Sequence, residues 1–177
     1  MIIKSMENYF ERYVTTWKEF NGTLPRTSWI GEEGQRLYVG DKDKEGYISW
    51  LPVKKDEITN FEYIEQHFNM KLDESIKEYY NSYYFFQLSG WIRDYNINLN
   101  TVLPDNEPET FLQRLSNYIE VHDGKTNYIP MGIESNGLVV VLDNITGDVC
   151  IEDFELGKFE SLSLNLEELI LNLTFGN

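Results

Sequence analysis

The chain has 177 residues, of which 41% are hydrophobic and 15% aromatic, so it can form a sizeable core and is too apolar for a disordered chain. It carries 30 acidic and 15 basic residues, a formal net charge of −15. Because it has one cysteine, Cys150, and no evident linker, the composition excludes a disulfide scaffold and predicts a single domain over residues 1–177.

The acidic residues are concentrated towards the C-terminus. Residues 101–177 contain 14 acids against only three bases, a net charge of −11. Such a surface repels nucleic-acid phosphates and anionic lipids and attracts basic proteins. We therefore expect no nucleic-acid partner. Since no stretch approaches the roughly 20 apolar residues of a membrane span, we expect a cytoplasmic protein that reaches the membrane only indirectly, through a partner.

The first half of the chain alternates between helical and strand patterns. Apolar residues at three- and four-residue steps predict a helix over residues 3–20. A strand is expected at 47–51. Asp56 is expected to cap the next helix, with Ile58 and Phe61 facing the core. Trp17, Trp50 and Phe61 fall at apolar positions of their elements and are predicted to be core residues. The remaining predictions for this half are a short helix at 72–80, an aromatic strand at 83–88 and a half-buried strand at 96–103.

The second half contains the clearest patterns. An amphipathic helix is predicted from Glu109 to Ile119. Strands are expected at 128–133, 138–142 and 148–153, joined by two good hairpin turns. The run 138–142 is apolar throughout, which predicts a central strand covered on both faces. Leucines and isoleucine between residues 164 and 173 predict a C-terminal helix.

None of the chemical motifs in the sequence is complete. The loop 41–46 begins like a calcium loop, but Pro52 stands where the bidentate glutamate belongs. His67 and His122 lack the paired spacing of zinc ligands, and Cys150 lies in an alternating strand pattern typical of a small buried side chain. We therefore predict no catalytic residues, no cofactor and no metal, and favour a binding role over an enzyme.

Several segments together resemble one protein family. The likeness is to the Syd family, bacterial proteins named for interaction with the SecY translocon subunit, within the SUKH superfamily of yeast cell-wall-synthesis regulators, Syd and Suppressor of fused. It is carried by residues 12–17, 47–52, 64–73 with 76–84, and 144–150 followed by 162–173.

The resemblance implies an α+β fold, in which a twisted, largely antiparallel sheet packs with helices. It also implies protein binding through an acidic concave face that touches basic cytoplasmic loops of the translocon. Many bacterial members of the superfamily are instead immunity proteins that block toxin domains, and a basic toxin, such as a nuclease, remains the alternative partner. The first hypothesis places the protein peripherally on the cytoplasmic face of the inner membrane.

Local acid density supplies candidate residues for the partner-binding face. They are Asp41, Asp43, Glu45, Asp148, Glu152, Asp153 and Glu155. Reversing the charge of Glu152, Asp153 and Glu155 to lysine is expected to slow association with a basic partner while leaving the fold intact.

Overall fold

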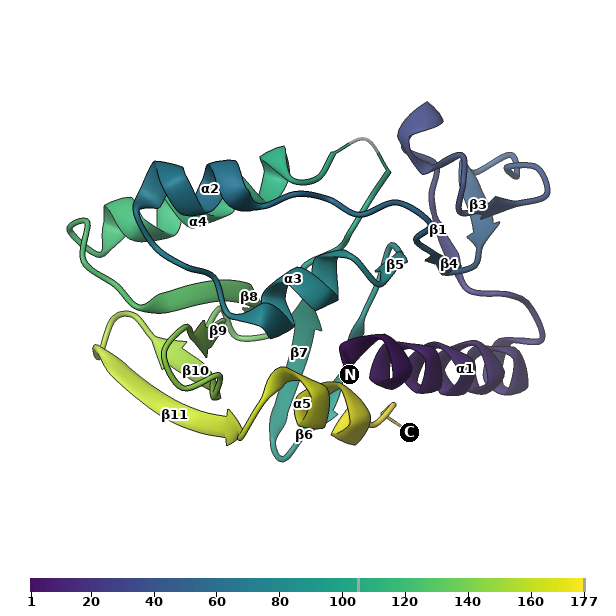
Figure 1. Ribbon diagram of the computed structural model, residues 1–177. Coiled ribbons are helices and arrows are strands. Elements are labelled where there is room, and N and C mark those ends of the chain that lie inside the picture. Colours follow the sequence, from purple (N-terminus) through teal and green to yellow (C-terminus); the bar gives the residue numbers. More distant parts are fainter. Residues whose placement is uncertain (105, 177) are drawn as a thin grey trace.

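A computed structural model describes residues 1–104 and 106–176 of the chain (Figure 1). It has the α+β architecture expected from the sequence, with helices packed around antiparallel sheets. The elements in chain order are α1 (Ile2–Asn21), β1 (Arg26–Ser28), a 3₁₀ turn η1 (Glu32–Gly34), β2 (Tyr38–Val39), β3 (Tyr47–Trp50), β4 (Val53–Lys54), α2 (Glu62–Phe68), α3 (Glu74–Tyr80), β5 (Tyr83–Tyr84), β6 (Ser89–Ile92), β7 (Tyr95–Leu99), α4 (Glu109–Val121), β8 (Tyr128–Glu134), β9 (Val139–Asp143), β10 (Val149–Asp153), β11 (Lys158–Ser163) and α5 (Leu166–Asn172).

Helix α1 matches its predicted span to within a residue at each end. Its apolar stripe, including Met6, Tyr9 and Tyr13, is buried, because residues three and four apart share one face of a helix. The helix ends at Gly22, which adopts a left-handed φ of 68°. Along the buried stripe, α1 packs beside α5 and the C-terminal end of α3.

The main sheet is a six-stranded antiparallel meander in the order β11-β10-β9-β8-β7-β6. The three strands predicted near the C-terminus are present as β8, β9 and β10. Strand β9 is internal and covered on both faces, as predicted: Val140 and Leu142 join the main core, whereas Val141 packs with Tyr118 of α4 and with Cys150. Cys150 is buried, as expected from its alternating strand.

Both edges of this sheet are engaged by other parts of the chain. At β6, the backbone of Trp91 exchanges hydrogen bonds with Thr174, at 2.7 and 2.9 Å. At β11, the sheet curls so that the β6–β7 turn reaches back, and the Arg93 guanidinium donates to the Ser161 carbonyl at 2.7 Å. The backbone bridge at Trp91 occupies part of the β6 edge and limits strand pairing with other chains there.

The prediction of core tryptophans is confirmed, whereas several local predictions are wrong. Trp50 and Phe61 are almost fully buried, and the partly buried Trp17 packs against the core. Asp56 does not cap a helix and Ile58 is 87% exposed, because α2 begins only at Glu62.

The C-terminal helix and two predicted strands are shorter than expected. Helix α5 starts at Leu166, capped by Asn165, which leaves Leu164 exposed. The aromatic run 83–88 contributes only the two-residue strand β5, and β7 ends at Leu99 rather than at residue 103.

A candidate acidic docking groove

The structure does not bring the predicted acidic residues together. Asp41, Asp43 and Glu45 lie in the exposed turn before β3, which belongs to a separate three-stranded sheet, β1-β3-β2. The acids between Asp148 and Glu155 lie on and around β10 in the main sheet. In Figure 1 these two regions lie on opposite sides of the view. They therefore form two separate acidic surfaces rather than one face.

In the turn before β3, Asp43 has a structural role. Its Oδ1 accepts hydrogen bonds from the backbone N–H groups of Glu45 and Tyr47, both at 2.9 Å, and its carboxylate forms an ion pair with Arg26. The hydrogen bond from Tyr47, followed by the pairing with Arg26, lowers the pKa of Asp43. Within residues 1–104 and 106–176, no group of three or more His, Cys, Asp or Glu side chains is arranged to hold a metal.

Glu152 does not belong to an exposed acidic face, which corrects the prediction from local acid density. Its side chain is buried, and its carboxylate accepts hydrogen bonds from the Tyr118 hydroxyl at 2.5 Å and from His122 Nε2 at 2.6 Å. Charge reversal to lysine would bury a cation among these groups, so we expect this substitution to destabilise the fold rather than leave it intact. Glu155 is exposed, whereas Asp148 and Asp153 are half-buried.

A groove of about 700 Å³ lies between the start of α1, the segment leading into α2, and α3. We call it the acidic groove because four glutamates and only one lysine line it. The lining residues are Met1, Ile3, Ile58, Thr59, Asn60, Phe61, Glu62, Glu65, Glu74, Lys77, Glu78, Asn81 and Ser82.

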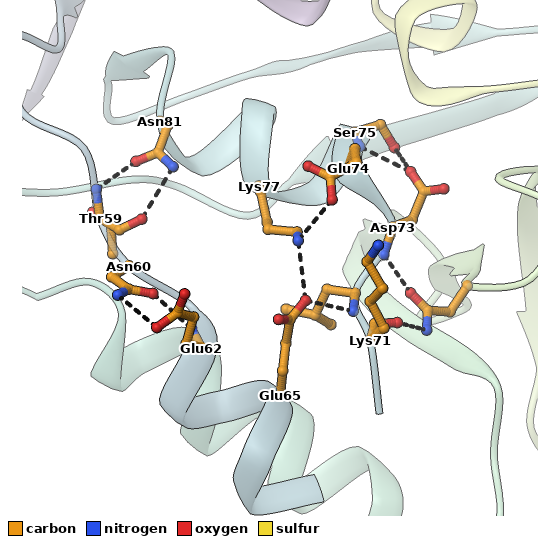
Figure 2. Close-up of polar contacts among 12 residues, drawn as sticks. Thr59, Asn60, Glu62, Glu65, Lys71, Asp73, Glu74, Ser75, Lys77 and Asn81 are labelled. Atoms are coloured by element: carbon orange, nitrogen blue, oxygen red, sulfur yellow. Dashed lines mark hydrogen bonds and ion pairs between the residues drawn. The ribbon is translucent and has the colours of Figure 1, made fainter. Parts of the chain in front are cut away.

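Lys77 is neutralised within the groove by two glutamates (Figure 2). Its Nζ lies 3.0 Å from Glu65 Oε1 and 2.8 Å from Glu74 Oε1. The hydrogen bond to Glu74 raises the pKa of Lys77. Burial alone would raise the pKa of Glu65, but hydrogen bonds from the Leu72 N–H and from Lys77 lower it. At neutral pH four carboxylates line the groove against the Lys77 ammonium and the N-terminal ammonium of Met1, which pairs with Glu167 outside the lining, so the groove keeps a negative charge.

The walls of the groove are fixed by amide side chains. Asn81, at the end of α3, accepts from the Thr59 N–H at 2.7 Å and donates to the Thr59 carbonyl at 3.2 Å, which holds the segment before α2 against α3 (Figure 2). At the other end of α3, Asp73 caps the helix by accepting from the Ser75 N–H. Asn144, in the β9–β10 turn, accepts in turn from the Asp73 N–H at 2.7 Å. These hydrogen bonds hold both ends of α3, which carries Glu74 and Glu78, against neighbouring segments.

The groove combines negative charge with apolar surface. Among its lining residues, Phe61 is 2% exposed and Ile58 is 87% exposed. This combination suits a partner segment that carries both basic and apolar side chains. Sequence reasoning missed the groove acids. The available signal was the helical spacing of Glu62 with Glu65 and of Glu74 with Glu78, which places each pair on one helix face.

No helix within residues 1–104 and 106–176 is both long and apolar enough to cross a bilayer.

Comparison with known proteins places the chain in a family. The family model described as Syd protein (SUKH-2) matches residues 3–174. A Protein Syd of Idiomarina loihiensis is 26% identical over 154 residues, covering 85% of this chain and 83% of the relative. One of Aliivibrio fischeri is 24% identical over 176 residues, covering 96% and 93%, and one of Psychromonas ingrahamii is 25% identical over 171 residues, covering 94% and 92%. The chain thus belongs to the Syd family.

Proposed function

We propose that this protein is a non-enzymatic binding module that docks on basic cytoplasmic loops of the SecY translocon. The observation that carries the proposal is the acidic groove, which is lined by four glutamates and by one lysine that pairs with two of them. Family membership supports it, because the Syd family takes its name from interaction with SecY. In this role the protein is cytoplasmic and approaches the membrane peripherally, through the translocon alone.

Charge complementarity of this kind acts mainly on the rate of association. Exposed charges steer a partner of opposite sign, and salt screens them over roughly 10 Å at 0.1 M. We therefore expect the on-rate of the protein for a translocon reconstituted in nanodiscs to fall steeply as salt is raised from 50 to 500 mM.

Three double variants with the same change of charge locate the docking surface. Glu62→Lys with Glu74→Lys alters the acidic groove. Asp41→Lys with Glu45→Lys alters the turn before β3, and Asp148→Lys with Glu155→Lys alters the surface around β10. By surface plasmon resonance, the groove pair should lower the on-rate at low salt about tenfold, and the other pairs far less. Equal effects of all three pairs, or binding that ignores salt, would remove the groove from the mechanism.

The alternative function is that of a SUKH-superfamily immunity protein that blocks a basic toxin domain. The same groove favours it, because an acidic, partly apolar groove complements the basic surface with which a nuclease holds its substrate. The three variant pairs should be assayed against a toxin domain encoded beside this gene. Groove-dependent binding to that domain, with none to the translocon, would establish the immunity role and overturn the translocon proposal.

A further inference from the structure

A second depression, of about 560 Å³, lies along the middle of α1. One wall is α1 itself, through Glu7, Glu11 and Val14, and the other is the segment at Leu51 and Pro52 that follows β3. We call this depression the α1 channel.

The floor of the α1 channel is aromatic. Phe10 and Tyr83 are 3% and 8% exposed, and their ring centroids lie 5.3 Å apart. Burial, and then the negative charges of Glu7 and Glu11, raise the pKa of Tyr83. Both carboxylates therefore act on the space above this floor. The channel repeats the chemistry of the acidic groove, with carboxylates above an apolar surface.

The α1 channel and the acidic groove adjoin. Ile3 lines the acidic groove and Glu7 lines the channel, and these residues are one helical turn apart on the same face of α1. Away from α1, Ser82 lines the groove and the next residue, Tyr83, belongs to the floor of the channel. In Figure 1 the N-terminal end of α1 lies beside α3.

The charge of the α1 channel is uncompensated. No lysine or arginine lines it, and neither Glu7 nor Glu11 has an ion pair within the part of the chain that the structure describes. A ligand with cationic groups can therefore pair with these exposed carboxylates without displacing an internal partner. A second copy of this chain, with a net charge of −15, is an unsuitable occupant because like charges repel.

We propose that the α1 channel holds the continuation of the partner segment that docks in the acidic groove, and that this continuation is extended, with alternating apolar and basic residues. The inference rests on the proposed docking function and names the partner's local chemistry. From Ile3 to Val14, α1 rises roughly 16 Å at about 1.5 Å per residue, a length that about five extended residues cover. Side chains of an extended segment alternate between two sides, so apolar ones meet the aromatic floor. Long basic ones at intervening positions reach the rim carboxylates.

The test uses fluorescent peptides of two lengths. The short probe has four basic residues, and the long probes add five residues of alternating leucine and lysine at either end. A control probe replaces the leucines by serine. In fluorescence anisotropy, the wild-type protein should bind the better long probe at least tenfold more tightly than the short one, and the serine probe should lose most of this gain.

Paired variants test whether the gain in affinity of the long probe comes from the α1 channel. Glu7→Gln with Glu11→Gln removes the rim charges without introducing bulk, and should abolish most of the gain while leaving the short probe's affinity unchanged. Glu32→Gln with Glu33→Gln changes the same charge on the exposed turn η1 and should preserve the gain. The channel proposal fails if the short probe binds but the long probes gain nothing, or if both variant pairs lose the gain equally. If the short probe does not bind the wild type and a long probe does, the docking role of the acidic groove fails instead.

Discussion

The cluster formed by Tyr118, His122 and Glu152 allows a sharp test of how a buried carboxylate is held between α4 and β10. His122 Nδ1 lies 2.8 Å from the Tyr118 carbonyl oxygen, and its Nε2 lies 2.6 Å from a Glu152 oxygen. A carbonyl and an ionised carboxylate can only accept, so below the raised pKa of His122 the protonated imidazole donates from both ring nitrogens. Burial first, and Glu152 second, raise the pKa of Tyr118, so its hydroxyl keeps the proton that it donates.

Replacing Glu152 by alanine leaves the Tyr118 hydroxyl and the His122 ring without their common acceptor. Hydrogen bonds to a charged group contribute about 1.5–3 kcal/mol each, and breaking a buried ion pair costs about 3–5 kcal/mol. Because the His122 side chain keeps 17% exposure, water can replace part of the loss. We expect the free energy of unfolding to fall by about 3 kcal/mol. For a chain of this length, that corresponds to a melting temperature about 6–12 °C lower.

Glu152→Gln removes the negative charge but keeps the size of the side chain. The pH dependence of stability then reports the effect of the charge. In the wild type, burial alone would lower the pKa of His122, but the hydrogen bonds to Glu152 and the Tyr118 carbonyl raise it above 6.5. The stabilisation is therefore complete below about pH 6.5 and is lost as pH rises through the raised pKa. A glutamine amide can donate to a neutral Nε2, so it favours the neutral ring. In the Glu152→Gln variant, the stabilisation from this hydrogen bond should therefore be lost as pH falls and His122 becomes protonated.

Urea unfolding of the wild type and both variants between pH 5 and 9 measures these effects. The stability difference between the wild type and Glu152→Gln should be largest near pH 5 and should shrink towards pH 9. A loss below 1 kcal/mol for Glu152→Ala, or identical pH profiles for the wild type and Glu152→Gln, would show that the pair is not ionised as the geometry requires.

Three further predictions concern packing and capping. Trp50→Ala should cost about 3–5 kcal/mol in urea unfolding, because the side chain is 1% exposed, whereas Trp29→Ala, at 46% exposure, should stay within about 1 kcal/mol. Gly132→Ala should lower the melting temperature strongly, since an added Cβ would lie 2.4 Å from the Asn98 carbonyl oxygen on β7; an unchanged melting curve would contradict this register. Asn165→Ala should cost about 1 kcal/mol by removing the cap of α5, and Asn165→Asp should restore it.

The elements that could be predicted are those whose patterns are local and regular. Helices α1 and α4 repeat apolar residues at helical spacing, and the strands between Tyr128 and Asp153 are separated by clear turn residues. Strand β6 escaped prediction because Gly90 suggests a break. In the structure this glycine is needed for a distant contact: a Cβ there would lie 2.7 Å from the Thr174 carbonyl oxygen, 84 positions away in the sequence. The sequence around such a glycine does not reveal the distant segment that packs against it.

The candidate docking surface could not be found from local acid density, because exposure depends on residues far apart in the chain. Glu152 lies next to Asp153 in an acidic stretch, yet its burial is decided by Tyr118 and His122, 34 and 30 positions earlier. Conversely, Glu62, Glu65 and Glu74 come from helices with lysines nearby in sequence. The excess of negative over positive charge in the groove appears only in the folded chain, where one lysine lies among these glutamates.

Net charge by chain half also does not locate the proposed docking surface. The half with the larger charge, residues 101–177 at −11, supplies none of the residues that line the acidic groove or the α1 channel. These depressions are built from the half whose acids and bases nearly balance. The two sets of acids therefore differ in position: the C-terminal acids add to a diffuse field over the surface, whereas the glutamates of the depressions lie where we propose that the partner docks. On the proposed function, raising salt should weaken the contribution of both sets, but at low salt substitutions in the depressions should slow association more than the same change of charge around β10.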